Sequence, residues 1–405
     1  MHWQKNTFST GREYAMLLFF IIVIFIIAIA VNRPAIFLVA GFISVFMLLN
    51  RLYDKQLGKK LSLENNKRSI RMFEGEESEF DLVLKNESIL PFINGYIEFT
   101  TDQKVNSKRF VISTRRSLNH YHVPLLLMGK SEARIPISFL AKKRGVVRLK
   151  NIQFSFPHIM KFEQVTLNYS VLYQTELLIY PKLIPVAGME DFTYNSFGNQ
   201  VTQVSPFEDL LSPVGTRDYV PTDPFHRIHW KASAKNQVMQ TKVYERNRKI
   251  SWTVVVNITE SSPLGNIYMS SELENYLSYA AYICHTITKK GYPIDLYLNA
   301  TGVGRQPFYL ESGSGTEHLK KALELLSRIE NDSSIMSVTN LLHRVDHMMD
   351  DSNIVVIVGE IYQESFHYTN KWNQNGKRVF QVIDTSEGAR LSEVKNERVV
   401  NDEAQ

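Results

Sequence analysis

The 405-residue sequence is poor in the residues and motifs that mark common enzyme classes. It contains one cysteine, Cys284, which excludes an internal disulfide and a cysteine-based structural zinc site. The glycine-rich stretches 302–304 and 313–315 lack the Lys-Ser/Thr ending of a phosphate-binding loop. His343 and His347 lie four residues apart, but no glutamate stands beside the first histidine as in the zinc motif His-Glu-x-x-His. No catalytic residue is therefore predicted.

Apolar residues are abundant near the start of the chain. Residues 14–31 carry no charge, and eighteen such residues approach the roughly 20 needed to cross a bilayer as a helix. After the break at Asn32-Arg33-Pro34, a second apolar run covers residues 35–49. The pair predicts a transmembrane hairpin over residues 1–53. A cleaved signal peptide, or a second run buried in protein, would give a similar pattern.

Lysine and arginine flank this hairpin unequally. Lys5 and Arg12 precede the first run, and only Arg33 lies in the connecting turn. Six basic residues follow between 51 and 68. Because cytoplasmic ends carry the excess of positive charge, we expect a multi-pass protein of the cell membrane with both termini cytoplasmic.

The middle region, residues 54–182, has the pattern of a β domain. Polar and apolar residues alternate in short runs, among them 79–84, 96–99 and 133–139. Strands at this spacing are typical of an antiparallel sandwich of immunoglobulin type.

The C-terminal region alternates between strand and helix patterns. Such alternation predicts a mostly parallel sheet covered by helices, in a domain that spans residues 183–386. The polar residues 387–405 are expected to form a flexible tail. The predicted strands are 252–258, 294–298, 354–358 and 379–383, and the clearest predicted helices are 318–329 and 338–349.

Residues 215–235, GTRDYVPTDPFHRIHWKASAK, are unusually dense in Arg, Asp, His and Trp. Pro221 and Pro224 flank Thr222-Asp223 and predict a turn. Ile228 and Trp230 are two residues apart, which is the spacing of one face of a strand. Residues 215–249 hold eight basic and three acidic residues, a net charge of +5.

This segment resembles the signature of the family called domain of unknown function 58. The residues that carry the resemblance are Arg217, Tyr219, Asp223, Arg227, Ile228, Trp230, Ser233 and Ala234. Upstream the chain departs from the family, because Phe156-Pro157-His158-Ile159 stands where the family often has Asp-Pro-Phe-Gly.

The resemblance implies an α/β domain similar to the von Willebrand factor A fold, whose first loop binds Mg²⁺ through Asp-x-Ser-x-Ser. Here the corresponding loop begins with Asn257, which loses the carboxylate, whereas Thr259 and Ser261 keep the hydroxyls. Thr339 and Glu360 are candidates for a further hydroxyl and a carboxylate. The loop is thus a degenerate candidate Mg²⁺ site or, alternatively, a helix cap with a strand-end turn. No other cofactor is predicted.

The resemblance also implies partners rather than a reaction. The family's relatives are commonly encoded beside MoxR-type AAA+ ATPases and transglutaminase-like membrane proteins. We therefore expect a non-catalytic adaptor that acts in the assembly or maturation of envelope-associated complexes. The signature residues either dock a partner or are structural, with Arg217 and Asp223 as a buried pair and Trp230 anchored in the core.

Two other functional classes remain open from the sequence. The first is an enzyme that acts on cell-envelope material. The second is a binder of anionic lipid or nucleic acid that uses the basic segment. Nucleic acid is the less expected of these ligands, because no known nucleic-acid motif accompanies the charge.

Overall fold

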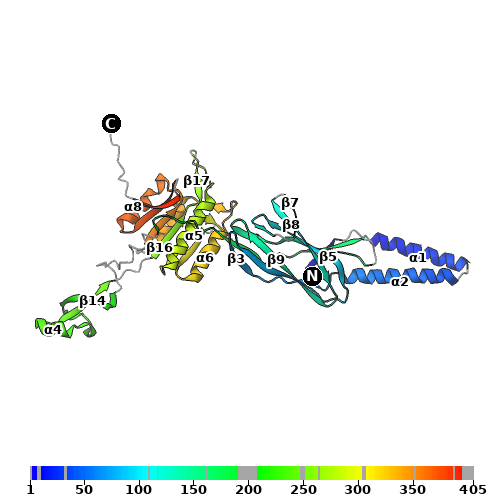
Figure 1. Cartoon of the computed structure of the whole chain (residues 1–405), viewed down its shortest axis with the longest axis horizontal. Helices are drawn as coiled ribbons and strands as arrows, with labels where there is room; N and C mark the ends of the chain where they lie inside the picture. Colours follow the sequence, from blue (N-terminus) through cyan, green and yellow to red (C-terminus); the bar gives the residue numbers. More distant parts are fainter. Residues whose placement is uncertain are drawn as a thin grey trace. The chain divides into compact units, whose positions relative to one another are not determined.

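The computed structural model divides into two compact units, Met1–Tyr180 and Pro181–Gln405, and each is described by itself (Figure 1). The described residues are 2–6, 11–31, 34–107, 110–115, 117–159, 163–189, 208–246, 251–262, 265–302, 307–349, 353–385 and 388–394.

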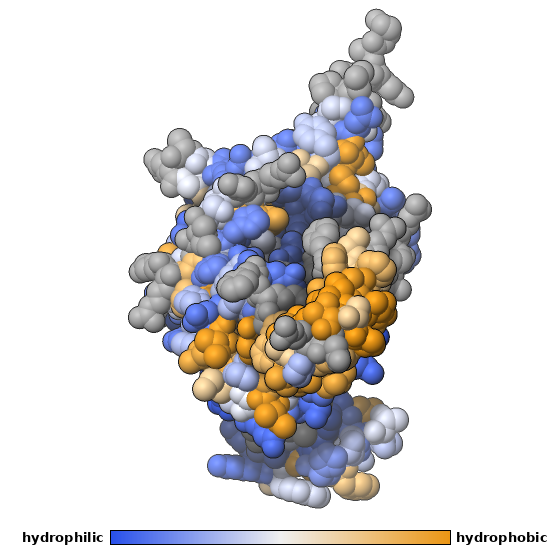
Figure 2. All heavy atoms as spheres, turned by 90° about the vertical axis from the view of Figure 1, so that its right-hand side faces the viewer, coloured by the Kyte–Doolittle hydropathy of each residue, from blue (hydrophilic) through white to orange (hydrophobic). Residues whose placement is uncertain are grey.

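Two apolar helices lie near the start of the first unit, α1 (Gly11–Val31) and α2 (Pro34–Gln56). Most of their large apolar side chains are exposed. Figure 2, which views the molecule from the end where these helices lie, shows apolar residues gathered into one surface. Among the described residues, one helix, Pro34–Gln56, is long and apolar enough to cross a membrane, and a shorter apolar helix, Ala15–Val31, precedes it.

The end of α2 is fixed to the β-rich part of the first unit. Tyr53 in its last turn and Leu57 just beyond it are buried in the core of that unit. The carboxylate of Asp54 lies 2.8 Å from Lys5 Nζ and 3.2 Å from Nε2 of the buried His158. His158 belongs to the segment that departs from the family pattern. In this chain the segment therefore helps to hold the apolar helix against the sheet.

The described residues of the first unit form three sheets. The six-stranded sheet has the order β1 (Trp3–Asn6), β12 (Gln164–Tyr169), β11 (Lys150–Pro157), β5 (Phe92–Asp102), β8 (Leu118–Leu127), β7 (Val111–Arg115). The four-stranded sheet has the order β2 (Leu61–Leu63), β4 (Glu77–Asn86), β9 (Ser131–Ala141), β6 (Val105–Asn106). The three-stranded sheet has the order β10 (Gly145–Arg148), β13 (Glu176–Tyr180), β3 (Ser69–Phe73).

Aromatic side chains join two of these sheets into one core. The rings of Phe99 on β5 and Tyr121 on β8 are stacked with centroids 4.8 Å apart. Tyr121 also meets Phe139 of β9, in the four-stranded sheet, edge-on at 5.6 Å. Because side chains alternate along a strand, each buried aromatic residue is flanked by residues on the opposite face of its sheet. The outer face of the six-stranded sheet is therefore free to carry polar groups.

The second unit is built on a seven-stranded sheet with helices packed against it. The strands β19, β16, β22 and β23 are parallel neighbours, whereas β20, β21 and β24 pair antiparallel at the edges. The strands are β20 (Pro307–Gly313), β19 (Ile294–Thr301), β21 (Ser334–Ile335), β16 (Ser251–Val256), β22 (Asn353–Val358), β23 (Arg378–Thr385) and β24 (Gly388–Glu393). The helices are α5 (Leu273–Lys289), α6 (Thr316–Ser327), α7 (Val338–Met348) and α8 (Phe366–Gln374).

The prediction of a flexible tail from residue 387 is wrong for residues 388–393. Residues Gly388–Glu393 form β24, which pairs with β23 from Phe380 to Thr385. An edge strand can be polar, because one side of it faces water while its backbone hydrogen bonds go to the neighbouring strand. Polarity alone therefore does not distinguish an edge strand from a flexible tail. Residues 395–405 lie outside the described part of the chain.

Candidate functional site

The signature residues lie in a small module, residues 208–246, which we call the signature module. Its frame is an antiparallel pair of strands, β14 (Glu208–Asp218) and β15 (Gln240–Arg246). The pairing is irregular on either side of Pro213, which has no N–H to donate to the ladder. Between the strands the chain makes a turn, the short 3-10 helix η1 (Phe225–Arg227) and the α-helix α4 (Trp230–Asn236).

Arg217 and Asp223 hold the turn that follows β14. The guanidinium donates two hydrogen bonds to the carboxylate, 2.8 and 2.5 Å long. Asp223 also accepts hydrogen bonds from the amide of Val220 at 3.0 Å and from the hydroxyl of Thr241 at 3.1 Å. The bonds from Arg217, with those from Val220 and Thr241, lower the pKa of Asp223 to about 2. Asp223 is therefore ionised throughout the physiological pH range.

The expectation of a buried pair is thus half correct. The bidentate bond forms, but the Arg217 side chain is 49% exposed, whereas that of Asp223 is 11% exposed. Arg217 Nη1 also donates a hydrogen bond to the backbone carbonyl of Asp218 at 3.1 Å, and a half-exposed guanidinium that holds the turn can also contact a partner.

The prediction of a strand through Ile228 and Trp230 is wrong. Ile228 makes a single bridge to Thr241, and a helix begins at Trp230. His229 caps this helix, since its Nδ1 accepts a hydrogen bond from the amide of Ala232 at 3.1 Å. The hydroxyl of Ser233 accepts a hydrogen bond from the amide of Gln240 on β15 at 2.8 Å. Two apolar residues at a spacing of two are too few to predict a strand, and the hydrogen bonds of His229 and Ser233 favour a helix instead.

Trp230 is not anchored in the core. Its side chain is 68% exposed, and Phe225, three residues before Ile228, is 73% exposed. Ile228, at 2% exposure, is the residue that holds this segment to the strands. Tyr219 lies beside Phe225 with ring centroids 6.3 Å apart. The sequence interpretation missed Phe225. Nothing in the signature pattern distinguishes this residue from its neighbours.

Arg227 and a group of smaller apolar residues complete the exposed surface. The guanidinium of Arg227 lies over the ring of Tyr244, 5.8 Å from its centroid. Further exposed apolar side chains of the module are Val220, Val238, Met239 and Val243. The exposed residues of α4 include Lys231 and Lys235. Exposed aromatic residues, methionine and arginine are the residue types that are enriched in protein interfaces, whereas lysine is depleted there.

The second candidate site lies at the carboxyl end of β16, where the degenerate metal loop was predicted. Asn257 and Thr259 are both buried, and Asn257 Oδ1 accepts hydrogen bonds from the amide and the hydroxyl of Thr259 at 3.1 and 2.8 Å. Asn257 Nδ2 donates to the backbone carbonyl of Glu360 at 2.7 Å, while the Glu360 side chain is exposed.

Asn299, a residue that the sequence interpretation missed, fills this site. Its Nδ2 lies 2.7 Å from Asn257 Oδ1 and 2.8 Å from Thr259 Oγ1. Its Oδ1 accepts a hydrogen bond from the amide of Ile258 at 2.8 Å, which determines how the amide is oriented. The two groups that would face a cation are thus already bonded to an amide nitrogen.

The other predicted metal ligands do not converge on this point. The hydroxyl of Thr339 lies 3.2 Å from that of Ser365, and Ser261 is exposed at the end of β17 (Thr259–Ser261). Within the described ranges, no group of three or more His, Cys, Asp or Glu residues could hold a metal. Because Mg²⁺ prefers anionic oxygen in octahedral geometry, these residues do not fit it.

Residues 215–403 match the family described as "Protein of unknown function DUF58". The resemblance to this family that Arg217–Ala234 indicated is thereby confirmed for residues 215–403. The DUF58 match begins within β14 and includes residues 215–246 of the signature module and the described strands and helices that follow it.

The chain is also similar to the uncharacterized protein YeaD of Bacillus subtilis (strain 168). The two are 23% identical over 199 residues, which cover 48% of this chain and 46% of YeaD. The match therefore spans about half the length of this curated relative.

Among solved structures the chain is similar to two cohesins. The seventh ScaB type I cohesin of Pseudobacteroides cellulosolvens is 10% identical with a TM-score of 0.20, over 29% of this chain and 91% of the cohesin. A non-cellulosomal cohesin of Archaeoglobus fulgidus is 7% identical with a TM-score of 0.20, over 34% of this chain and 99% of the cohesin. Similarity at this level carries no conclusion about fold or function.

Proposed function

We propose that this protein is a membrane-anchored, non-catalytic adaptor that docks a partner protein through the signature module. The observation that carries the proposal is the exposure of Trp230 and Phe225 on a module whose turn is joined by the Arg217–Asp223 hydrogen bonds. A soluble surface gains nothing from two such exposed aromatic rings, whereas an interface gains most of its affinity from a few residues of this kind.

The proposed partner class rests on the family resemblance of the signature residues. The resemblance implies a MoxR-type AAA+ ATPase, with a transglutaminase-like membrane protein in the same assembly. The adaptor would bring a client to the ATPase during the assembly or maturation of envelope-associated complexes. The basic residues Lys231 and Lys235 beside Trp230 favour a partner surface that carries acidic side chains.

The membrane arrangement is part of the same proposal. We infer that α1 and α2 cross the membrane as a hairpin, which makes the protein multi-pass with both termini cytoplasmic. The apolar surface of the two helices supports this arrangement, as do the basic residues at both ends of the hairpin. Arg33, the basic residue of the connecting turn, lies outside the described residues.

The finer fold assignments belong to the proposal as well. We infer an immunoglobulin-like sandwich for residues 54–182, supported by the shared core of the six-stranded and four-stranded sheets. We infer a von Willebrand factor A-like domain for residues 183–386, supported by the central parallel strands and their helices. Its candidate metal site would then be closed by Asn299.

A binding assay with purified components tests the function. The full-length protein in detergent is mixed with a purified MoxR-type ATPase encoded by the same organism, and complex formation is measured. Trp230→Ala is expected to weaken binding at least tenfold, because truncation of an interface tryptophan typically costs about 2 kcal/mol or more.

Ile89→Ala is the matched control, since Ile89 is a large apolar residue of the first unit that is 78% exposed. It should bind as the unchanged protein does. The proposal fails if the ATPase does not bind, or if Trp230→Ala folds normally and binds with unchanged affinity.

A further inference from the structure

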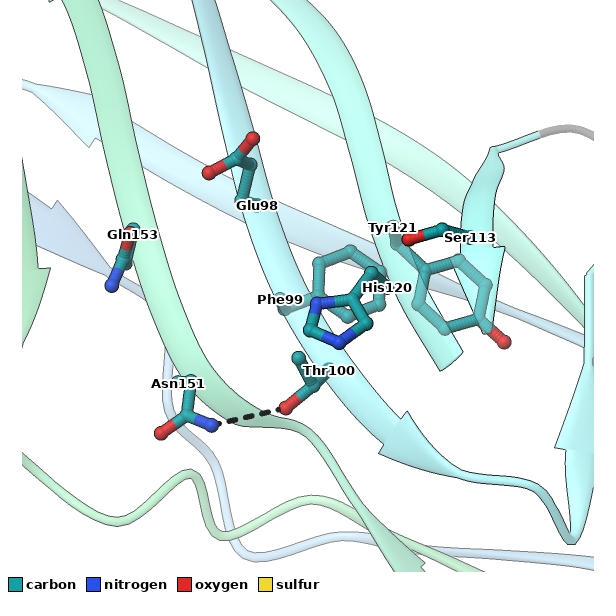
Figure 3. A pocket seen from close by; sticks show the side chains of 8 residues that line it. All are labelled: Glu98, Phe99, Thr100, Ser113, His120, Tyr121, Asn151 and Gln153. Atoms are coloured by element: carbon teal, nitrogen blue, oxygen red, sulfur yellow. Dashed lines mark hydrogen bonds between the residues drawn. The ribbon is translucent and has the colours of Figure 1, made fainter. Parts of the chain in front are cut away.

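A polar pocket lies on the outer face of the six-stranded sheet, in the first unit. Its volume is about 440 Å³, within the range of about 300–1,000 Å³ that is usual for small-molecule sites. Four strands contribute to it, β5, β7, β8 and β11 (Figure 3). The lining residues are Glu98, Phe99, Thr100, Ser113, His120, Tyr121, Asn151 and Gln153.

The register of the strands brings the polar side chains together. Glu98 on β5 is opposite Gln153 on β11, and Thr100 is opposite His120 on β8. His120 is in turn opposite Ser113 on β7. Opposite residues in an antiparallel sheet share one face, so these side chains form a continuous polar surface. Phe99 and Tyr121 are buried, as alternation requires.

Several of these side chains have unused hydrogen-bonding groups. Within the described part of the chain, the side chains of His120, Ser113 and Gln153 form no hydrogen bond. Asn151 donates one, to the hydroxyl of Thr100 at 3.3 Å, and its carbonyl oxygen is not used (Figure 3). The pocket therefore offers donors and acceptors from three strands to a ligand or to water.

The charge of the pocket restricts the ligand. Glu98 is the only carboxylate among the lining residues, and no lysine or arginine lines the pocket. Glu98 Oε1 lies 3.2 Å from His122 Nδ1, and phosphates and other anions would meet this carboxylate with no lysine or arginine in the lining to offset the repulsion. An apolar ligand would leave the amide, imidazole and hydroxyl groups without partners. A neutral ligand with many hydroxyl groups avoids repulsion by Glu98 and can also pair with the amide, imidazole and hydroxyl groups.

We propose that this pocket binds a neutral sugar of one or two rings. Adjacent hydroxyls of a sugar can each donate and accept a hydrogen bond, which matches the planar side chains of Glu98, Asn151 and Gln153. Beside the pocket, the rings of Tyr96 and His122 are 4.0 Å apart and inclined by 30°. Such a ring pair gives the apolar face of a sugar a surface on which to pack.

Saturation-transfer NMR of the full-length protein tests the proposal. A detergent without a sugar headgroup is essential, since a glycosidic detergent would compete. The probes are glucose, maltose, cellobiose and diacetylchitobiose, with glucose 6-phosphate as the charged comparison. At least one neutral sugar should receive saturation, and glucose 6-phosphate should bind at least tenfold more weakly than glucose. A parallel measurement with vesicles that carry a glucosyl lipid separates a soluble sugar from a lipid headgroup, and binding in either form supports the proposal.

Gln153→Ala is expected to reduce the affinity for the bound sugar about tenfold, because one or two hydrogen bonds to the sugar are lost. Arg134→Ala, on the exposed surface of the four-stranded sheet, should have no effect. Glu98→Gln keeps the shape of the pocket and should allow glucose 6-phosphate to bind more tightly. The proposal is overturned if no neutral sugar or glucosyl lipid binds, or if binding is unchanged in a folded Gln153→Ala, His120→Ala double variant.

Discussion

Arg217 and Asp223 share two hydrogen bonds across six residues of chain, and these bonds join the end of β14 to the turn that precedes η1. The carboxylate is the centre of the arrangement, because it also accepts from the backbone of Val220 and from Thr241 on β15. One acidic residue thus connects both strands of the signature module with the segment that carries Phe225 and Trp230.

The stability that the ionised Asp223 gives to the turn should depend on pH. The pKa of about 2 lies below the ordinary value of 3.8, so the stabilisation is fully present above about pH 4 and is lost as the pH falls through about 2. We expect the carboxyl ¹³C shift of Asp223 to titrate near pH 2, with Asp223→Asn used for assignment. A midpoint near 4 would show that the pair does not form in solution.

Arg217→Lys should loosen the turn without unfolding the protein. Lysine cannot form the bidentate bond, but the Arg217 side chain is half exposed, so the loss of global stability should be small. The amide of Val220 should exchange its hydrogen faster, because the carboxylate that it donates to is no longer held in place. Unchanged exchange at Val220 would count against the role given to Arg217.

Asn299→Ala should destabilise the second unit by about 1–3 kcal/mol. The substitution leaves the buried amide of Ile258 without its acceptor and removes one of the hydrogen bonds that Asn257 Oδ1 accepts. Denaturant unfolding measures the loss. Asn275→Ala, which removes one exposed hydrogen bond to Glu272, is the control and should cost less than about 0.5 kcal/mol.

The same site predicts the response to magnesium. Since the Asn299 amide occupies the position between Asn257 and Thr259, millimolar MgCl₂ should leave the thermal midpoint of the unchanged protein where it is in a matched concentration of NaCl. A midpoint that rises with Mg²⁺ would contradict the conclusion that these residues do not fit the ion.

Gly359→Ala should be far more damaging than Gly376→Ala. Both glycines have positive φ, 101° and 75°, so both substitutions strain the backbone. A Cβ at 359 would also lie 2.2 Å from the carbonyl oxygen of Asn257, whereas one at 376 meets nothing within 4 Å. We expect a loss of about 1 kcal/mol at 376 and about 3 kcal/mol or more at 359. Equal losses in thermal unfolding would refute the close approach of the two strand ends.

Cys284 should be chemically inert in the folded protein. Burial raises the pKa of its thiol to about 12, so almost no thiolate exists at neutral pH. Iodoacetamide should label it only after unfolding, at a rate that follows the unfolded fraction. Rapid labelling of the native protein would show that the helix around Cys284 opens readily.

The sequence by itself determined the features that depend on local pattern. The apolar runs gave α1 and α2, and alternation gave the β-rich first unit. The change to strand and helix patterns after Ile250 gave the core of the seven-stranded sheet. The signature residues indicated the DUF58 family and the Arg217–Asp223 bond, because residues six apart around a turn are brought together by local geometry.

Tertiary contacts decided the rest. Trp230 begins a helix because Ser233 is bonded to Gln240 of β15, and the polar residues 388–393 form a strand because β23 offers them an edge. Asn299 fills the candidate metal site through a hydrogen bond to Thr259, which lies 40 residues away in sequence. No sequence periodicity connects residues that far apart. Local pattern reports the conformations that a segment prefers. The partners that a buried polar group finds are fixed only when distant strands come together.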